Sequence, residues 1–331
     1  MPAIAPERLV AAISNAISDS GYTGNLVSSL RRHPRRFVVV GPSVSFTLSI
    51  YAWTLTFGGR PQLANEYRIQ MTSVQSPLQM GTDGPTVLIG YEPTLSLFAG
   101  FDLRRHRKFT GGSPSVQIDR PALRRAETEG LSFHRKGNDE IAIGIRPDMF
   151  MAYVMNAEIL HRYGSEANVL RLLNSAVQQQ PLREREVELL TQERQHLIVA
   201  VSRWSRLSGF KQRVLFAYGN RCAVTRVQLR LVDAAHILPV GAPSSVDHVR
   251  NGIALSPTYH RAFDAGLIYL DEQCRMRINE GQLHVLEGSN LAGGLESFSE
   301  PLGQIFLPPD ANQRPHLDFI RKANLLRQIR T

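Results

Sequence analysis

The stretch LVDAAHILPVGAPSSVDHVRNGIALSPTYHRAFDAG, residues 231–266, decides the fold of the second half of the chain. The apolar run at 229–240 predicts a strand that Pro239 ends, and polar residues 241–252 follow as a loop. Residues 253–266 then change from a short strand into a helix that ends at Gly266. The order strand, loop, strand, helix predicts a compact unit able to hold one metal ion.

Four polar residues of this unit, His236, Asn251, His260 and Asp264, are spaced so that they could form one catalytic site. His260 and Asp264 are four residues apart, so on a helix they share one face and both can reach one cation. His236 belongs to the first predicted strand, and Asn251 follows the loop.

Hydrolysis of a phosphodiester needs a deprotonated water, a cation to neutralise charge on the phosphate, and a loop held in place between them. A neutral His236 on a strand, facing a metal on the helix, supplies the first two. A buried Asn251 can bridge loop backbones because its amide both donates and accepts. Each residue alone has a plainer interpretation: a structural histidine, an Asn-Gly turn, or a surface pair on a helix.

The sequence segments around these residues resemble the HNH nuclease family, which has a ββα-metal fold and is common in bacterial restriction-type endonucleases. The matching segments are RCAVTRVQLRLVDAAHILPV, NGIALSPTYHRAFDAGLIYL and IFLPPDANQRPHLDFI, within residues 203–325. This resemblance implies that His236 is the general base, Asn251 fixes the loop and His260 is a metal ligand. It also implies a divalent ion, Mg²⁺ or Mn²⁺ first, with Zn²⁺ or Ni²⁺ in some members.

One residue departs from the family pattern. Many members carry Asp or His directly before the base, whereas this chain has Ala235, which cannot bind a metal. Asp233 lies two residues earlier, on the same face of the predicted strand. We therefore predict Asp233 as a replacement ligand, with Asp264 completing the set beside His260. Alternatively, Asp233 is a solvated carboxylate and Asp264 caps the helix or pairs with an arginine.

The first half of the chain is rich in predicted strands, and residues 148–176 are predicted to be helical. The stretch between Arg36 and Arg60 has no charge and is long enough to span a bilayer. It contains Gly41 and Pro42, and SFTLSIYAWTLTF alternates with a period of two, which favours buried strands.

We expect an α+β protein, with a strand-rich N-terminal recognition domain and a C-terminal ββα-metal (HNH) nuclease domain. The expected domain boundaries are 1–180, a helical linker at 181–205, and the nuclease domain at 206–331.

The chain has 38 Lys and Arg against 29 Asp and Glu, a net charge of +9 that favours a polyanionic partner. A basic cluster precedes Gly111-Gly112 and is predicted to be a loop tip that contacts double-stranded DNA. We predict the DNA-binding residues Arg104, Arg105, Arg107, Lys108, Arg250 and Arg261. The alternative is that these side chains only solvate strand ends.

Four aromatic residues, Tyr51, Trp53, Phe57 and Tyr67, are either core residues or the lining of a pocket for a flipped, modified base. The only cysteines are Cys222 and Cys274, which excludes a disulfide scaffold and a four-cysteine zinc site and fits a reduced cytoplasm. The N-terminus lacks the pattern of a signal peptide.

Together these features predict a metal-dependent DNA endonuclease that defends against foreign DNA, either sequence-specific or modification-dependent. A double-strand cut by one small site per chain suggests a homodimer. The alternative is a non-catalytic DNA-binding regulator with a degenerate HNH fold, favoured by Ala235. An RNA-directed or toxin-like nuclease is a third possibility.

Overall fold

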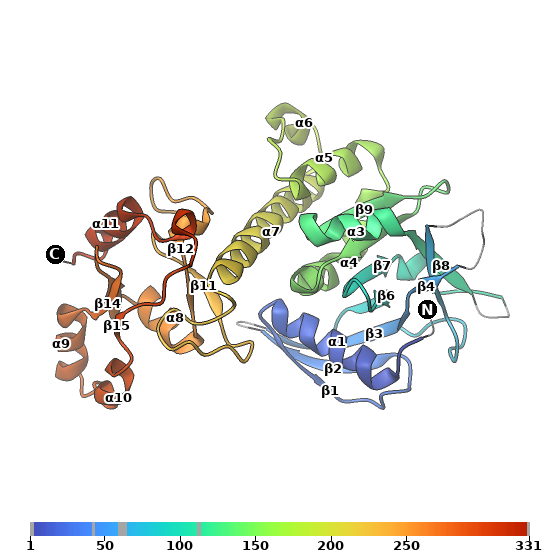
Figure 1. Cartoon of the computed structure of the whole chain (residues 1–331). Coiled ribbons are helices and arrows are strands. Elements are labelled where there is room, and N and C mark those ends of the chain that lie inside the picture. The colour runs from blue at the N-terminus through green and yellow to red at the C-terminus, as the bar shows by residue number, and fades with distance from the viewer. Residues whose placement is uncertain (1–2, 42–43, 59–64, 111–113, 330–331) are drawn as a thin grey trace. The chain divides into compact units, whose positions relative to one another are not determined.

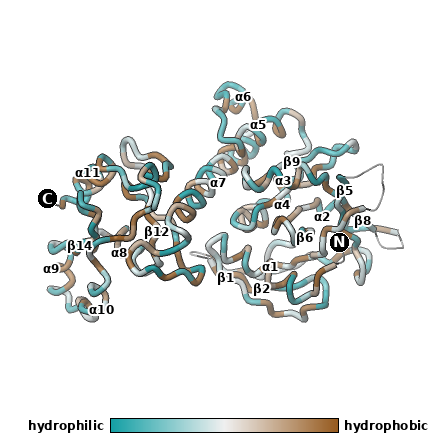
Figure 2. The backbone as a smooth tube through the Cα atoms, in the orientation of Figure 1, coloured by the Kyte–Doolittle hydropathy of each residue, from teal (hydrophilic) through white to brown (hydrophobic). Residues whose placement is uncertain are grey.

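The computed structural model describes residues 3–41, 44–58, 65–110 and 114–329, and the chain divides into two compact units, Met1–Ser208 and Gly209–Thr331. The division falls within one long helix, α7 (Gln192–Ala217). The segment 181–205, expected to be a helical linker, contains α6 (Glu184–Glu188) and the first half of α7. In Figure 2, α6 is mostly hydrophilic, which agrees with its lack of buried residues.

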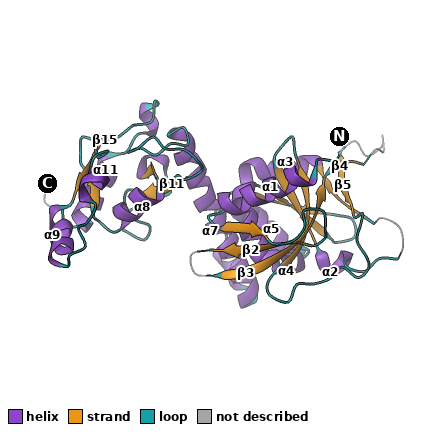
Figure 3. Cartoon of the chain, turned by 90° about the horizontal axis from the view of Figure 1, so that it is seen from below, coloured by secondary structure: helices purple, strands orange, loops and turns teal. Residues whose placement is uncertain are grey.

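The first unit contains a mixed sheet, which Figure 3 shows as a fan of strands flanked by helices. Its order in the described chain is β1 (Thr23–Leu26), β2 (Arg35–Val40), β3 (Ser45–Thr54), β6 (Thr86–Glu92), β7 (Leu97–Phe101), β10 (Ile141–Ile145) and β9 (Leu131–Arg135). β3 and β6 are parallel, whereas the other neighbours are antiparallel. A smaller sheet joins β4 (Thr56–Phe57), β5 (Glu66–Gln70) and β8 (Ser115–Asp119).

Both faces of the sheet are buried at its central strands, because alternate residues of one strand enter different cores, whereas β1 and one side of β2 are partly exposed. In β6, Val87 and Ile89 enter a core that also contains residues of α1, α4 and α5, whereas Leu88 enters a second core with residues of β5, β8 and α3. Besides α6 and the first part of α7, the described helices of this unit are α1 (Pro6–Asp19), α2 (Leu103–His106), α3 (Arg120–Glu129), the 3-10 turn η2 (Pro147–Met149), α4 (Phe150–Gly164) and α5 (Ala167–Val177).

The uncharged stretch after Arg36 contributes to β2, β3 and β4, which confirms the prediction of strands. β3 is mostly buried, as expected, whereas Phe57 of β4 is exposed. Within the described parts of the chain, no helix combines the length and the apolar character needed to cross a membrane. The helical prediction for 148–176 is also confirmed, although α4 and α5 are separate helices.

The second unit begins with the predicted hairpin and helix. β11 (Asp233–His236) pairs with β12 (Gly252–Leu255) in antiparallel register, and α8 (Pro257–Asp264) follows directly (Figure 1). The remaining elements are η3 (Val249–Asn251), β13 (Ile268–Leu270), β14 (Arg275–Ile278), α9 (Glu280–Gly288), α10 (Leu295–Ser299), β15 (Gly303–Gln304), η4 (Ala311–Gln313) and α11 (Leu317–Leu326). The expected α+β class, with a strand-rich first part and a ββα second part, is confirmed.

The first strand of the hairpin is shorter than predicted. Leu229 and Arg230 have φ values of 45° and 55°, so the chain turns in the left-handed region before the strand begins. At the other end, the backbone of Leu238 bonds to the side chain of Asn251 instead of to a neighbouring strand. β11 is therefore limited to Asp233–His236.

The hairpin packs closely on α7 at Gly252, the residue opposite His236. A Cβ atom at Gly252 would lie 2.2 Å from Val214 and 3.1 Å from Phe210, both on α7. The absence of a side chain at this position therefore allows the close approach of helix and hairpin. Ile253 and Leu255 on the same strand are buried in the core of this unit.

Candidate active site

His236 lies at the end of β11, and its ring is held on two sides. Its Nε2 is 2.8 Å from Oδ1 of Asp247, a residue of the loop between β11 and β12. The ring also stacks on Phe210 with a centroid distance of 3.8 Å and an interplanar angle of 11°. The side chain is 12% exposed, so the imidazole is mostly enclosed but reaches solvent.

Asp247 is the site residue that sequence reasoning missed. An aspartate in a polar loop is common, and nothing in its spacing marks it. The sequence signal that was available is weak: one carboxylate within the loop that begins after the predicted base.

Asn251 is fully buried and holds the loop from inside. Its Oδ1 accepts from the backbone N–H of Leu238 at 2.8 Å, and its Nδ2 lies 3.2 Å from the carbonyl oxygen of Leu238. The same amide nitrogen lies 3.0 Å from the carbonyl of Val246 and 3.3 Å from Oγ of Ser245. These contacts match the loop-bridging chemistry expected of this residue.

His260 lies on α8 between two carboxylates. Its Nδ1 is 3.9 Å from Asp233 Oδ2, and its Nε2 is 3.3 Å from Asp264 Oδ2. The Asp233 carboxylate raises the pKa of the His260 imidazole, and the imidazole in turn lowers the pKa of Asp233. Lys211 on α7 also lies 3.9 Å from Asp233. The site thus places one imidazole beside partly exposed carboxylates on a strand and a helix.

The donor set fits a divalent ion only in part. Among the described residues, no group of three or more His, Cys, Asp or Glu side chains is arranged to hold a metal. The two carboxylates face opposite nitrogens of His260, and an imidazole offers a given ion one nitrogen. Asp233 with His260 therefore fits an open site with two protein ligands, which leaves positions for water and phosphate. Ligation by Asp264 in addition stays a prediction.

Ala235 is buried in the core of the second unit and is 1% exposed. Its register partner is Ile253, whereas that of Asp233 is Leu255, and the two residues are two positions apart on β11. Asp233 is thus the residue of β11 whose carboxylate lies near His260, and its role as a replacement ligand stays a prediction.

The basic cluster of the first unit begins in a helix instead of the predicted loop. Asp102 caps α2, since its Oδ1 accepts from the backbone N–H of Arg104 at 2.9 Å. Arg104, Arg105 and Lys108 are exposed, and Arg104 pairs with Glu158 at 2.7 Å. The expected loop tip at Gly111-Gly112 lies outside the described residues.

Two members of the cluster have internal partners. Arg105 Nη1 donates to the carbonyl of Asn138 at 3.2 Å, and Arg107 Nε donates to the carbonyl of Leu78 at 3.0 Å. His106 lies 2.6 Å from the buried carboxylate of Glu140. Burial acts to raise the pKa of Glu140, but His106 and Lys136 outweigh it and lower that pKa to about 2. These contacts hold the cluster against the sheet.

The two arginines predicted in the second unit differ in exposure. Arg261 is exposed on α8, directly after His260. Arg250 is half-buried, and its Nε lies 3.4 Å from the carbonyl of Arg314. The N–H of His316 donates to the carbonyl of Arg250 at 3.0 Å, so the tail of the chain packs on the end of the loop.

The four aromatic residues predicted to be either core or pocket lining, Tyr51, Trp53, Phe57 and Tyr67, form two separate pairs. Tyr51 and Trp53 lie 6.4 Å apart, and His33 stacks on Trp53 at 4.2 Å. Phe57 and Tyr67 lie 6.3 Å apart. Tyr51 is buried, with its hydroxyl bonded to the backbone of the loop before β6, so this residue serves the core.

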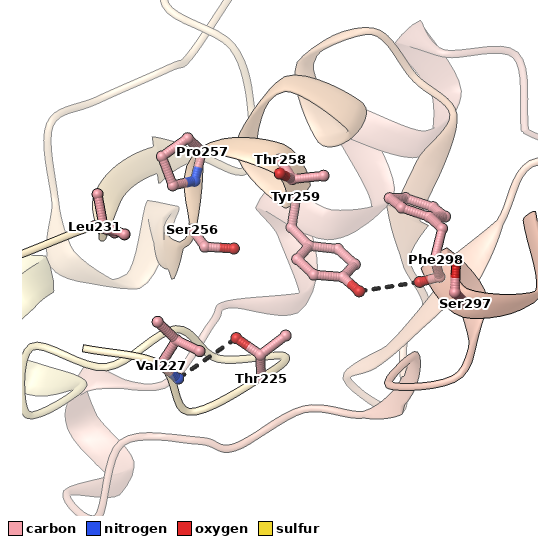
Figure 4. A pocket seen from close by; sticks show the side chains of 9 residues that line it. All are labelled: Thr225, Val227, Leu231, Ser256, Pro257, Thr258, Tyr259, Ser297 and Phe298. Carbon is pink, nitrogen blue, oxygen red and sulfur yellow. Dashed lines mark hydrogen bonds between the residues drawn. The ribbon is translucent and has the colours of Figure 1, made fainter. Parts of the chain in front are cut away.

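A pocket of about 580 Å³ opens where α8 begins, and Figure 4 shows its lining. The lining residues are Thr225, Val227, Leu231, Ser256, Pro257, Thr258, Tyr259, Ser297 and Phe298. None of the predicted catalytic or metal-binding residues is among them. Cys222, buried nearby, lies 3.8 Å from Oγ of Ser256.

Comparison with known proteins gives two family matches. A model described as HNH endonuclease matches residues 222–271, and a model described as Methylase-associated X1 matches residues 46–154. The first match falls inside the region whose sequence resembles that nuclease family. It contains each predicted catalytic residue.

Among solved structures, the modification-dependent TagI restriction endonuclease is similar, with 14% sequence identity and a TM-score of 0.28. The alignment covers 83% of this chain and 80% of that chain. No curated protein matches this sequence.

We predict that Asn251→Ala releases the loop between β11 and β12. The change removes the acceptor of the Leu238 N–H and a donor to the carbonyl of Val246, whereas the carbonyl of Leu238 keeps its bond from Oγ of Ser245; the loss costs about 1–3 kcal/mol of unfolding free energy. Hydrogen exchange measures the effect: the Leu238 amide should lose its protection. The matched control is Asn324→Ala, a second buried asparagine of this unit, whose amide bonds to Leu270. Equal protection of Leu238 in the two variants would contradict the role of Asn251.

Proposed function

We propose that this chain, which contains an HNH endonuclease domain at residues 222–271, is a metal-dependent endonuclease that hydrolyses phosphodiester bonds in double-stranded DNA. The observation that carries the proposal is the geometry of the hairpin and helix within that domain. His236 and the pair of Asp233 and His260 lie on β11 and α8, and buried Asn251 holds the loop between the strands.

His236 acts as the general base in this proposal. Its free nitrogen takes a proton from a water, the water oxygen forms a bond to phosphorus, and the bond from phosphorus to the leaving oxygen breaks. The leaving oxygen then takes a proton from solvent. Proton transfer of this kind contributes a rate factor of about 10²–10⁴.

Asp233 and His260 would hold the divalent ion, Mg²⁺ or Mn²⁺. When bound, such an ion neutralises charge that develops on the phosphate and on the leaving oxygen. The residues themselves leave coordination positions open, since Asp233 is 45% exposed and His260 26%. Asp264 remains the third candidate ligand, although it faces the opposite nitrogen of His260.

We assign target recognition to the first unit, and DNA contact to Arg104 and Arg105 of α2, to Lys108 just after that helix, and to Arg261 and Arg250. The net charge of +9 and the exposed Arg104, Arg105 and Lys108 support this assignment. The match of residues 46–154 to a methylase-associated family supports a function that is associated with DNA modification. We therefore propose a restriction role in defence against foreign DNA.

Digestion of methylated, hydroxymethylated and unmodified DNA, followed by end sequencing, tests this role. Cleavage at defined sites or unequal cleavage of the three substrates would support restriction, whereas equal cleavage at random positions would contradict it.

One site per chain cuts one strand, so a double-strand cut calls for a homodimer. The mass of the protein–DNA complex tests the proposed homodimer: two chains on the DNA would support it, and one chain would contradict it.

The rival function is that of a DNA-binding regulator without nuclease activity. Ala235 favours it, because this position supplies a metal ligand in many HNH nucleases and here is buried in the core. The two functions differ in what happens to bound DNA, so a cleavage assay separates them.

We predict that His236→Ala abolishes plasmid nicking in Mg²⁺ or Mn²⁺, with a loss of about 100-fold or more, because the base is removed. Binding to the same DNA should persist. His284→Ala, at an exposed histidine of α9, is the control and should nick at the wild-type rate. Wild-type nicking by His236→Ala would refute the assignment of the base, and a wild type that binds without nicking would favour the regulator.

We also predict that replacing Arg104 and Lys108 with Gln weakens DNA binding and makes its salt dependence shallower. Each lost phosphate contact reduces the slope of log K against log salt by about 0.9, so the double variant should lose about 2. Arg183→Gln, an exposed arginine that pairs with Glu186, is the control. An unchanged slope in the double variant would argue against DNA contact through Arg104 and Lys108.

A further inference from the structure

We propose that Asp247 is a positioning residue for His236: its carboxylate fixes the tautomer and the direction of the imidazole, so that Nδ1 is the nitrogen that accepts the proton. This inference rests on the proposed function, in which His236 is the general base. It adds a residue from the loop between β11 and β12 to a site otherwise formed by the two strands and α8.

The hydrogen bond itself assigns the tautomer. Nε2 of His236 lies 2.8 Å from Oδ1 of Asp247. An ionised carboxylate only accepts, so Nε2 must carry the hydrogen and donate it. In a neutral imidazole the other nitrogen, Nδ1, then holds the free electron pair. A base needs that pair free and directed at the attacking water.

Packing fixes the plane of the ring. Phe210 on α7 is 2% exposed and lies almost parallel to the imidazole, at 11° and 3.8 Å between centroids. Stacking restricts the ring to one plane, and the bond to Asp247 restricts its rotation within that plane. The two contacts together set the direction in which Nδ1 points.

The backbone of Asp247 is itself held. Arg213 on α7 donates from Nη2 to the carbonyl of Asp247 at 2.9 Å. On the preceding residue, the carbonyl of Val246 accepts from the buried amide of Asn251 at 3.0 Å. The carboxylate is 14% exposed, so solvent competes little for its contact with the imidazole. Asp247 is therefore a fixed acceptor, in contrast to an aspartate on a freely moving loop.

The carboxylate has a second effect during the reaction. When His236 takes the proton from water, the ring becomes an imidazolium and both nitrogens carry hydrogen. A carboxylate 2.8 Å away stabilises that cation in a poorly solvated place. Removing the charge while keeping the side-chain shape should therefore slow the chemical step without changing DNA binding.

The test is Asp247→Asn, measured for cleavage and by ¹⁵N NMR of the His236 ring. The neutral amide can either accept from Nε2–H or donate to Nε2, so it no longer selects one tautomer. We expect kcat to fall about 10- to 100-fold, by analogy with partners that orient a functional histidine. KM for DNA should stay within about twofold, and the NMR signals should change from the Nε2–H tautomer to a mixture.

Asp318→Asn is the matched control, since Asp318 also lies beside a histidine of this unit, 3.8 Å from His316 Nδ1. It should keep the wild-type kcat and the His236 tautomer. An Asp247→Asn protein that keeps either of these would overturn the inference while the proposed function stands. A wild type with no cleavage in Mg²⁺ or Mn²⁺ would overturn the proposed function and, with it, this role of Asp247.

Discussion

The buried amide of Asn251 is the contact on which the rest of the site depends. It bonds to the backbone of Leu238, just after β11, and to the backbone of Val246, just before Asp247. An asparagine suits this place because one side chain offers both an acceptor and donors, which two facing backbone segments require. The bond to the N–H of Leu238 is costly to break, since Asn251 and Leu238 are both fully buried and water cannot easily replace the lost partner.

The short hairpin directs different polar side chains toward two helices. Toward α7, His236 stacks on Phe210, and Gly252 opposite it allows the helix to approach. Toward α8, Asp233 approaches His260. His236 and Asp233 are three positions apart on β11, so the proposed base contacts α7 and the proposed metal-binding pair lies toward α8. This separation allows one imidazole to stay free for proton transfer while the other carries the charge interactions.

Much of this arrangement could be predicted from the sequence, because it follows from local signals. The spacing from His236 to Asn251 and His260 predicts the order of strand, loop, strand and helix. Gly266, with a φ of 74°, follows the real end of α8, whereas β11 already ends before Pro239. The short length of β11 could not be predicted, since it depends on a side-chain bond from Asn251 to Leu238. The one-turn helix that carries Arg104 was hidden because its cap, Asp102, resembles any turn aspartate. The role of Asp247 and the two-sided placement of His260 between carboxylates needed coordinates, because loop geometry decides both. The parallel pairing of β3 with β6 likewise depends on distant segments.

In the mechanism we propose, His236 and the Asp233–His260 pair act on the same phosphate from two sides. The most direct measurement is a crystal structure of the chain with Mn²⁺ and an uncleaved DNA duplex, with the ion located by its anomalous scattering. We expect an anomalous peak within bonding distance of Asp233, His260 and the phosphate whose attacking water donates to Nδ1 of His236. A peak remote from both ligands, or an imidazole with no water or phosphate within reach, would contradict it.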